Sequence, residues 1–272
     1  MPFSPFLDDA RAFVADAPRY LRDLVAFLRA RAGDVPGYLV GALVALIVIG
    51  LALWAFVAIV DGFLNEETLF RIDGLVKDSV ERIATPEAAL AMARVTNLSA
   101  PILVVVVTLG LAAYFAIRRL WDYLFMLALA LGLGELMLYA LKVLFDRARP
   151  TAGTTHDAYG ASFPSGHAFT ALVLYGLLAY LVWQITERGW ARALAVAFAV
   201  GATLAVGFSR LYLGVHWLTD VLGGYAAGVA WLVFSIALVR FLEARREHRA
   251  AVAPPLHPET PVQPETPVRS DP

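Results

Sequence analysis

The chain has 272 residues, of which 60% are apolar and only 17% are charged, whereas soluble domains are nearer half apolar and a quarter charged. This balance, with a mean hydropathy of +0.67, indicates an integral membrane protein. The formal net charge of −1 provides no basic surplus for nucleic acid. A chain without cysteine has no disulfide, thiolate chemistry or cysteine-based metal site.

Residues 1–37 are predicted to form a cytoplasmic amphipathic segment. Apolar side chains recur there at helical spacing among arginines and aspartates, as is typical of a helix that lies in the membrane interface. They are Phe13, Tyr20, Leu21, Leu24, Phe27 and Leu28. The apolar run that follows is too long for the hydrophobic region of a signal peptide, so we expect a retained membrane helix.

Six apolar segments follow, and each is predicted to cross the membrane as a helix, which takes about 20 residues. They lie at about 38–60, 102–117, 121–145, 168–185, 190–208 and 218–241. The second is short unless it begins near Asn97. The predicted fold class is therefore all-α, an integral membrane six-helix bundle over residues 38–242.

Basic residues between the segments predict the orientation of the bundle. The N-terminal segment, the turns at 118–119 and 187–192 and the C-terminal end carry most of the 22 Lys and Arg. Because cytoplasmic loops are enriched in Lys and Arg, we expect both termini in the cytoplasm and the loops 61–97, 146–164 and 209–217 outside. We expect a short surface helix in the first of these loops and assign it no chemistry.

Residues 243–272 are predicted to be a cytoplasmic, Pro-rich tail. The stretch PPLHPETPVQPETPVRSDP repeats PETPV and offers no apolar core. Such a composition is typical of disordered segments, so we expect a disordered C-terminal tail.

Two polar clusters flank the third and fourth segments on the predicted outer side. In KVLFDRARP, Lys142 and Arg149 stand seven residues apart, nearly two helical turns, which predicts that both project from one face before Pro150 ends the helix. In FPSGHA, Ser165 and Gly166 are predicted in the first turn of the fourth helix, where backbone N–H groups and the helix dipole attract phosphate-like anions. The neighbouring His167 adds a titratable group.

A third cluster, SRLYLGVHWLTD, joins the fifth and sixth segments. Arg210 follows the fifth helix, and His216 and Asp220 are predicted to open the sixth. Their i,i+4 spacing places both side chains on one helical face. A carboxylate that accepts the proton of one ring nitrogen leaves the other nitrogen as a nucleophile or base.

Each cluster alone has an ordinary structural interpretation. Cations at a helix end anchor it at the interface, and a Pro-Ser-Gly run or a helix-capping His is common without chemistry. Together the clusters supply three cations, two histidines, a carboxylate and a helix N-terminus on one side of the membrane. That combination favours the binding and transfer of a phosphoryl group.

The three clusters match, in order and spacing, the signature motifs of a known family. They read Lys142-x6-Arg149-Pro150, Pro164-Ser165-Gly166-His167 and Ser209-Arg210-x5-His216-x3-Asp220. The chain resembles the type 2 phosphatidic acid phosphatase superfamily, which includes membrane lipid phosphatases and soluble vanadium haloperoxidases. The resemblance covers roughly residues 95–240, and no motif position departs from it.

The resemblance implies a reaction that needs no metal and no other cofactor. By it, His216 attacks phosphorus and forms a phosphohistidine, Asp220 orients His216, and His167 protonates the leaving oxygen before water hydrolyses the intermediate. The implied phosphate ligands are Lys142, Arg149, Ser165, Gly166, Ser209 and Arg210.

The predicted function is therefore hydrolysis of a phosphate monoester or diphosphate on a lipid, on the outer face of a bacterial-type plasma (inner) membrane. Undecaprenyl diphosphate, phosphatidic acid, phosphatidylglycerol phosphate and a lipid A phosphate are the candidate substrates. A lipid phosphotransferase and a non-catalytic transporter or scaffold are the alternatives. The sequence leaves open the oligomeric state and the role of Glu135, a mid-helix carboxylate. It is either functional, or it is neutral or hydrogen-bonded within the bundle.

Overall fold

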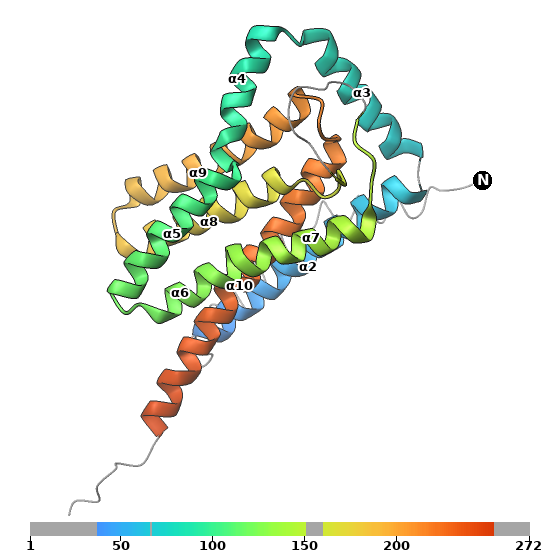
Figure 1. Ribbon diagram of the computed structural model, residues 1–272. Coiled ribbons are helices and arrows are strands. Elements are labelled where there is room, and N and C mark those ends of the chain that lie inside the picture. The colour runs from blue at the N-terminus through green and yellow to red at the C-terminus, as the bar shows by residue number, and fades with distance from the viewer. Residues whose placement is uncertain (1–36, 66, 151–159, 253–272) are drawn as a thin grey trace, which may run out of the picture.

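The computed structural model describes residues 37–65, 67–150 and 160–252, which form helices and connecting loops without a strand (Figure 1). The bounds of these elements are α2 Gly37–Asn65, α3 Glu67–Ile83, α4 Pro86–Thr96, the short 3-10 helix η1 Asn97–Ser99, α5 Pro101–Ile117, α6 Trp121–Leu127, the π-helical η2 Ala128–Leu133, α7 Gly134–Phe145, α8 Gly166–Ile185, α9 Gly189–Tyr212 and α10 Leu218–Val252. The predicted amphipathic segment, apart from Gly37, lies outside the described residues.

Six stretches of the described chain are long and apolar enough to cross a membrane, which confirms the predicted all-α fold class. They are Leu39–Gly62, Pro86–Ile117, Trp121–Phe145, Gly166–Ile185, Gly189–Tyr212 and Leu218–Glu247. The second stretch starts earlier than predicted because α4 and η1 lead directly into α5. Helix α10 continues to Val252, past the predicted start of the tail at residue 243. The rest of the predicted tail lies outside the described residues.

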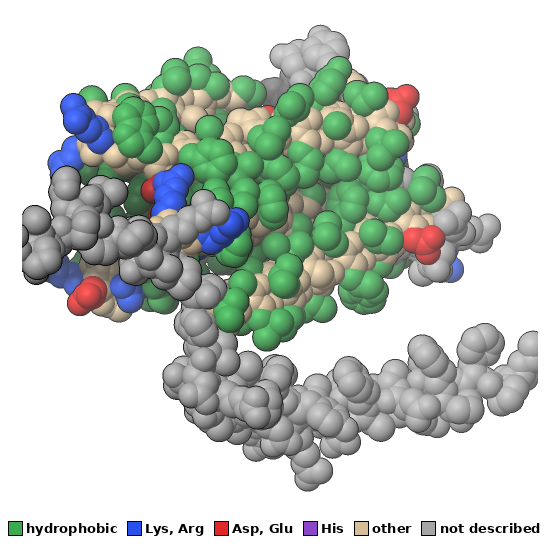
Figure 2. Space-filling model, turned by 90° about the horizontal axis from the view of Figure 1, so that it is seen from below, with side chains coloured by type: hydrophobic (Ala, Val, Ile, Leu, Met, Phe, Trp, Pro, Cys, Tyr) green, Lys and Arg blue, Asp and Glu red, His purple; other side chains and the backbone are tan. Residues whose placement is uncertain are grey.

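Helix α8 is the most buried of the six spans, and α2 is the most exposed. The side chains of Ala168, Ala171 and Val173 on α8 are fully buried, whereas Leu46 and Trp54 on α2 are largely exposed although apolar. Figure 2 shows hydrophobic side chains spread over one face of the bundle. Large exposed apolar surfaces mark a contact with another apolar phase, here the hydrocarbon of the bilayer.

The third span contains a π-helical segment that is tied to α10. Trp231 Nε1 donates to the carbonyl oxygens of Leu129 and Ala130 at 3.2 and 3.0 Å. A π-bulge shifts the backbone hydrogen-bond pattern of a helix, and here an indole N–H binds carbonyls of the bulge. Gly134 admits the indole, because a Cβ there would lie 2.7 Å from Nε1. The position of α7, which carries Lys142, is therefore set from α10.

Helices α3 and α4 form an arch beside the ends of α8 and α9 (Figure 1). The hydroxyl of Tyr212, at the end of α9, donates to Ile83 O at 3.1 Å and accepts from Thr85 N at 3.1 Å. The hydroxyl of Tyr175 on α8 donates to Leu98 O at 2.6 Å. The predicted outer loop is thus two helices that are fastened to the bundle, and not a single surface helix.

Candidate active site

The first motif reaches the site by a sharp turn after α7. Helix α7 ends at Phe145 because Asp146 adopts a left-handed backbone conformation with φ of 37°. The prediction that Lys142 and Arg149 share one helical face is therefore wrong. The two cations converge by another route: Lys142 Nζ and Arg149 Nη2 donate to the same carbonyl oxygen of Ala161, at 2.9 and 3.2 Å.

The second motif forms the start of α8, as predicted. Ser165 is the N-cap, and its Oγ accepts from Ala168 N at 3.5 Å. Ser165 N donates to Asp220 O at 3.0 Å, so this helix start is fixed against the start of α10. Gly224 permits that approach, since a Cβ there would lie 2.7 Å from Ser165 O. A Cβ at Gly166 would meet protein atoms only at ordinary contact distances, so packing does not explain that glycine, whereas close approach of an anion does.

The third motif is arranged differently from the prediction, because α10 begins at Leu218 and His216 precedes it. Gly214, with φ of 66°, turns the chain between α9 and this segment. Asp220 Oδ2 accepts from Trp217 N at 2.9 Å and lies 3.3 Å from His216 Nδ1. An acidic side chain in the first helical turn that binds the N-cap N–H is one half of a capping box. The predicted His216–Asp220 pair therefore forms through a helix cap.

The hydrogen bonds of His216 determine which ring nitrogen carries its proton. Arg149 Nη1 lies 3.2 Å from His216 Nε2. A guanidinium only donates, so Nε2 accepts, and the proton of the neutral ring is on Nδ1, where it is donated to Asp220. Burial lowers the pKa of His216 to about 4, against the opposing hydrogen bond to Asp220. At neutral pH the lone pair on Nε2 is therefore free of a proton and faces the guanidinium of Arg149.

Arg210 lies near the end of α9 and is 6% exposed. Its Nη1 donates to Thr96 Oγ1 at 3.0 Å, while its buried Nε has no hydrogen-bond partner among the residues that the structure describes. Buried donors are rarely left without a partner, so this Nε fits an anionic ligand. The neighbouring Ser209 Oγ donates to Val206 O at 2.6 Å; its proton is therefore committed within α9.

His167, the second residue of α8, is partly buried. It is close enough to Arg210, His216, Arg149 and Lys142 to interact with them electrostatically. The structure thus brings both predicted histidines and all three predicted cations to one end of the bundle.

Glu135, two turns before Lys142, lies in the first turn of α7. Its carboxyl group is hydrogen-bonded to Thr170 Oγ1 on α8. Its side chain is exposed on the surface of the described chain. The hydrogen-bonded interpretation of this residue is therefore met, and no contact links its carboxyl group directly to His216 or Asp220 among the described residues.

Two site residues were missed from the sequence, Arg147 and Asp73. Arg147 Nη1 donates to Asp220 Oδ1 at 2.7 Å, and its Nη2 donates to Asp73 Oδ2 at 2.8 Å. Asp73 belongs to α3, in the loop to which the sequence assigned no chemistry. One signal was available in the sequence: Asp73 stands seven residues before Val80, which puts both on one face of a helix. The structure buries both side chains.

Cations dominate this site, because Lys142, Arg147, Arg149 and Arg210 are grouped around two buried carboxylates, Asp73 and Asp220. Such a surplus next to a lone-pair nitrogen suits an anionic electrophile, above all a phosphoryl group. Together with the membrane-spanning bundle, it defines a membrane enzyme that acts on phosphate groups.

Comparison with known proteins gives the family. The PAP2 superfamily model matches residues 119–243. The chain is 32% identical over 181 residues to phosphatidylglycerophosphatase B of Bacillus subtilis (strain 168), covering 65% of this chain and 88% of that protein. It is 34% identical over 108 residues to an undecaprenyl-diphosphatase of Sulfolobus acidocaldarius, covering 39% of this chain and 48% of that protein.

A solved structure agrees with these matches. The crystal structure of a transmembrane PAP2 type phosphatidylglycerolphosphate phosphatase from Bacillus subtilis has a TM-score of 0.62 and 28% identity, covering 74% of this chain and 96% of that one. The chain belongs to the PAP2 superfamily, as the motifs predicted. It is a multi-pass membrane lipid phosphatase, a hydrolase.

Proposed function

We propose that this protein removes the terminal phosphate of a membrane lipid by transferring it to Nε2 of His216, without a metal ion. The observation that carries the proposal is the placement of His216: Nδ1 lies 3.3 Å from Asp220 Oδ2, to which it donates a hydrogen bond, and Nε2 lies 3.2 Å from Arg149 Nη1. A neutral imidazole held in this way is an activated nucleophile.

In the first step the lipid phosphate is bound by Lys142, Arg149 and Arg210, with the Ser165 hydroxyl and the Gly166 N–H as further donors. Nε2 forms a bond to phosphorus as the bond from phosphorus to the lipid oxygen breaks. The leaving oxygen takes the bond electrons and a proton from His167. Asp220 stabilises the positive charge that the imidazole ring acquires.

In the second step a water molecule attacks the phosphorus of the phosphohistidine, and His167 accepts a proton from it. The nitrogen–phosphorus bond breaks, its electrons return to Nε2, and inorganic phosphate leaves. Both histidines then have their starting protonation states, so the cycle closes without a co-reactant.

Phosphatidylglycerol phosphate is the proposed substrate, because a relative matched over 181 residues and a solved structure that matches 74% of this chain are both named for it. Undecaprenyl diphosphate is the second candidate, favoured by the 34% identity to an undecaprenyl-diphosphatase. Both carry a terminal phosphate on a lipid that stays in the bilayer, which suits a site at the end of membrane-spanning helices.

The site is proposed to face outward, with both termini in the cytoplasm. Arg118 and Arg119 follow the end of α5, Arg188 follows the end of α8, and Arg192 lies in the first turn of α9. Because α8 starts at the site, the basic turn after α8 lies at the other end of that helix. Basic turns favour the cytoplasmic side.

The chain has no cysteine, so single variants E81C and R188C can be labelled separately in intact cells. An impermeant maleimide should label E81C alone; labelling of R188C alone would reverse the proposed orientation.

The test of the chemistry is phosphate release from both lipids by purified protein in EDTA. Wild-type protein should remain active, and His216→Ala should lose activity beyond detection while keeping the thermal unfolding profile of the wild type. Alkaline quenching, in which a phosphohistidine survives, with radiolabelled p-nitrophenyl phosphate should trap labelled protein in His167→Ala and none in His216→Ala. Activity that vanishes in EDTA and returns with Mg²⁺ would overturn metal independence. Substantial turnover by His216→Ala would overturn the nucleophile.

A further inference from the structure

Helix α3 contributes a buried carboxylate to the neighbourhood of the catalytic pair. Asp73 Oδ1 accepts from Thr219 N at 3.0 Å, and its Oδ2 accepts from Thr219 Oγ1 at 2.6 Å and from Arg147 Nη2 at 2.8 Å. Its side chain is 1% exposed. Asp73 therefore fixes both the first turn of α10 and the guanidinium of Arg147.

Arg147 joins this carboxylate to Asp220. Its Nη1 donates to Asp220 Oδ1 and to Thr219 Oγ1, both at 2.7 Å, and its guanidinium carbon lies 5.8 Å from the centre of the Trp217 ring. The planar fork of an arginine can serve two carboxylates in one fixed geometry, which a lysine cannot do. The side chain is 9% exposed, so water competes little for these bonds.

The two oxygens of Asp220 have separate partners. Oδ1 accepts from Arg147 and, at 3.4 Å, from Ser162 Oγ, whereas Oδ2 accepts from Trp217 N and faces His216 Nδ1. Rotation of the carboxylate about its side-chain axis would break the bonds on both oxygens together. The bonds on Oδ1 thus determine where Oδ2 lies relative to the imidazole.

We propose that Asp73 and Arg147 are positioning residues for catalysis: Asp73 holds Arg147, Arg147 holds Oδ1 of Asp220, and Oδ2 is thereby aimed at Nδ1 of His216. This inference rests on the proposed role of His216. It makes α3, which lies outside residues 119–243 of the family match, a working part of the active site. Neither residue is among the proposed phosphate ligands, so both should act on the rate of phosphoryl transfer through Asp220.

The test compares Arg147→Lys and Asp73→Asn with wild-type protein on phosphatidylglycerol phosphate in detergent–lipid micelles. Loss of the outer partner of a metal-ligating side chain typically costs about 10–100-fold in activity. We expect a loss of similar size here, in kcat, with KM changed by less than about threefold. Arg82→Lys is the matched control, because Arg82 lies on α3 with Asp73 and, among the contacts described, bonds only to nearby residues of that helix. It should keep wild-type kcat.

A double-mutant cycle separates positioning from plain stabilisation of the fold. If Arg147 acts through Asp220, adding Arg147→Lys to Asp220→Asn should lower kcat by less than about threefold further, because interacting residues are not additive. Full additivity of the two losses, or wild-type kcat in Asp73→Asn, would overturn the proposal. Thermal unfolding of each variant identifies losses caused by misfolding, and Asp73→Asn, which is isosteric, keeps the test decisive if Arg147→Lys does not fold. Failure of the proposed function would appear separately, as turnover by His216→Ala.

Discussion

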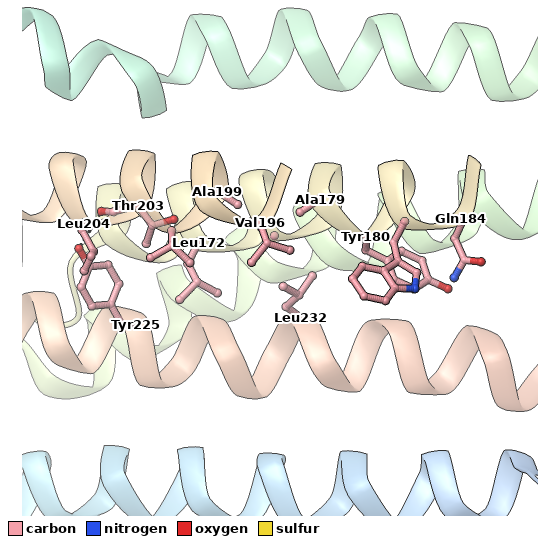
Figure 3. A pocket seen from close by; sticks show the side chains of 13 residues that line it. Leu172, Ala179, Tyr180, Gln184, Val196, Ala199, Thr203, Leu204, Tyr225 and Leu232 are labelled. Atoms are coloured by element: carbon pink, nitrogen blue, oxygen red, sulfur yellow. Dashed lines mark hydrogen bonds between the residues drawn. The ribbon is translucent and has the colours of Figure 1, made fainter. Parts of the chain in front are cut away.

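Two regions of the bundle differ in what fills them: the polar cluster around His216 and an apolar groove between α8, α9 and α10. The groove encloses about 690 Å³, and its lining includes Leu172, Gly176, Val196, Ala199, Tyr225 and Leu232. Figure 3 shows side chains from all three helices turned toward it. The polar cluster is compact by comparison, but it contains Arg210, His216 and Asp220, all buried. The larger volume thus lies among apolar side chains. Buried ionisable residues mark the functional site of a membrane protein, and here they lie in the polar cluster.

Tyr225 lies at the end of the groove that is nearer the site. Its hydroxyl donates to Thr203 O at 2.7 Å, and its ring packs so closely on α9 that a Cβ at Gly207 would overlap it. Asp220 stands just over one turn before Tyr225 on α10. The tyrosine therefore separates the groove from the catalytic pair, and the two regions should respond differently to substitution.

The largest loss of activity in this comparison is expected from His167→Ala, a substitution within the polar cluster. Loss of a general acid typically costs about 10²–10⁴-fold in rate. A lipid alkoxide needs the proton as it leaves, whereas a nitrophenolate leaves readily without it. Turnover of phosphatidylglycerol phosphate should therefore fall far more than turnover of p-nitrophenyl phosphate. The measurement is kcat/KM for both substrates with both proteins.

An equal loss on the two substrates would contradict the role of His167 as the acid. His167 would then be a phosphate ligand, and only His216 would remain as a proton-transferring or nucleophilic histidine of the cluster. Asp220→Asn is the comparison variant, because Asp220 acts on the nucleophile and its loss should slow both substrates by a similar factor.

The motif residues and the six spans were predictable because their signals are local. Apolar length predicts a span, and the spacing of Lys142, Arg149, His216 and Asp220 matched a family pattern. The C-terminal end of α10 was not predicted, because residues 243–252 are polar and hydropathy stops at the membrane surface. Good helix formers such as Glu, Ala and Arg continue the helix there.

Two other features were missed because they depend on contacts between segments far apart in the sequence. Asp73 and Thr219 are 146 residues apart, and no periodicity connects them. The π-helical η2 has the sequence ALALGL, which looks like ordinary membrane helix; its carbonyls are bound by Trp231 of α10. The turn at Asp146 was also missed, because aspartate tolerates the left-handed backbone conformation without requiring it.

The next expected effect is a pH dependence of kcat/KM that arises from protonation of His216 in the polar cluster. Burial lowers the pKa of His216 to about 4 from an ordinary 6.5, so the nucleophile stays neutral down to about pH 4. The acid limb of kcat/KM should have its midpoint there, and each further pH unit should cost about tenfold.

The unfolded chain binds the proton between pH 6.5 and 4 while the folded protein does not, so this residue also lowers the free energy of unfolding as pH falls through that window.

The pH profile of kcat/KM should be measured with two substrates whose phosphates ionise at different pH. A limb caused by protonation of His216 should have the same midpoint with both substrates, whereas a limb caused by ionisation of the substrate should shift between them. Because the hydrogen bond to Asp220 raises the pKa of His216, Asp220→Asn should move the limb to still lower pH. A limb fixed near pH 6.5 would show that burial does not lower the pKa of His216.

The smallest effect is expected in the groove. Val196 lines it and is 44% exposed, so Val196→Trp adds bulk to the open volume without overpacking the core. Val57→Trp, on the lipid-facing surface of α2, is the matched control at a side chain that is 62% exposed. Because Tyr225 separates the groove from the site, both variants should keep kcat/KM within about twofold, as exposed substitutions usually do. A loss above about tenfold in Val196→Trp on long-chain lipid, with p-nitrophenyl phosphate unaffected, would instead make the groove the binding site of the substrate chain.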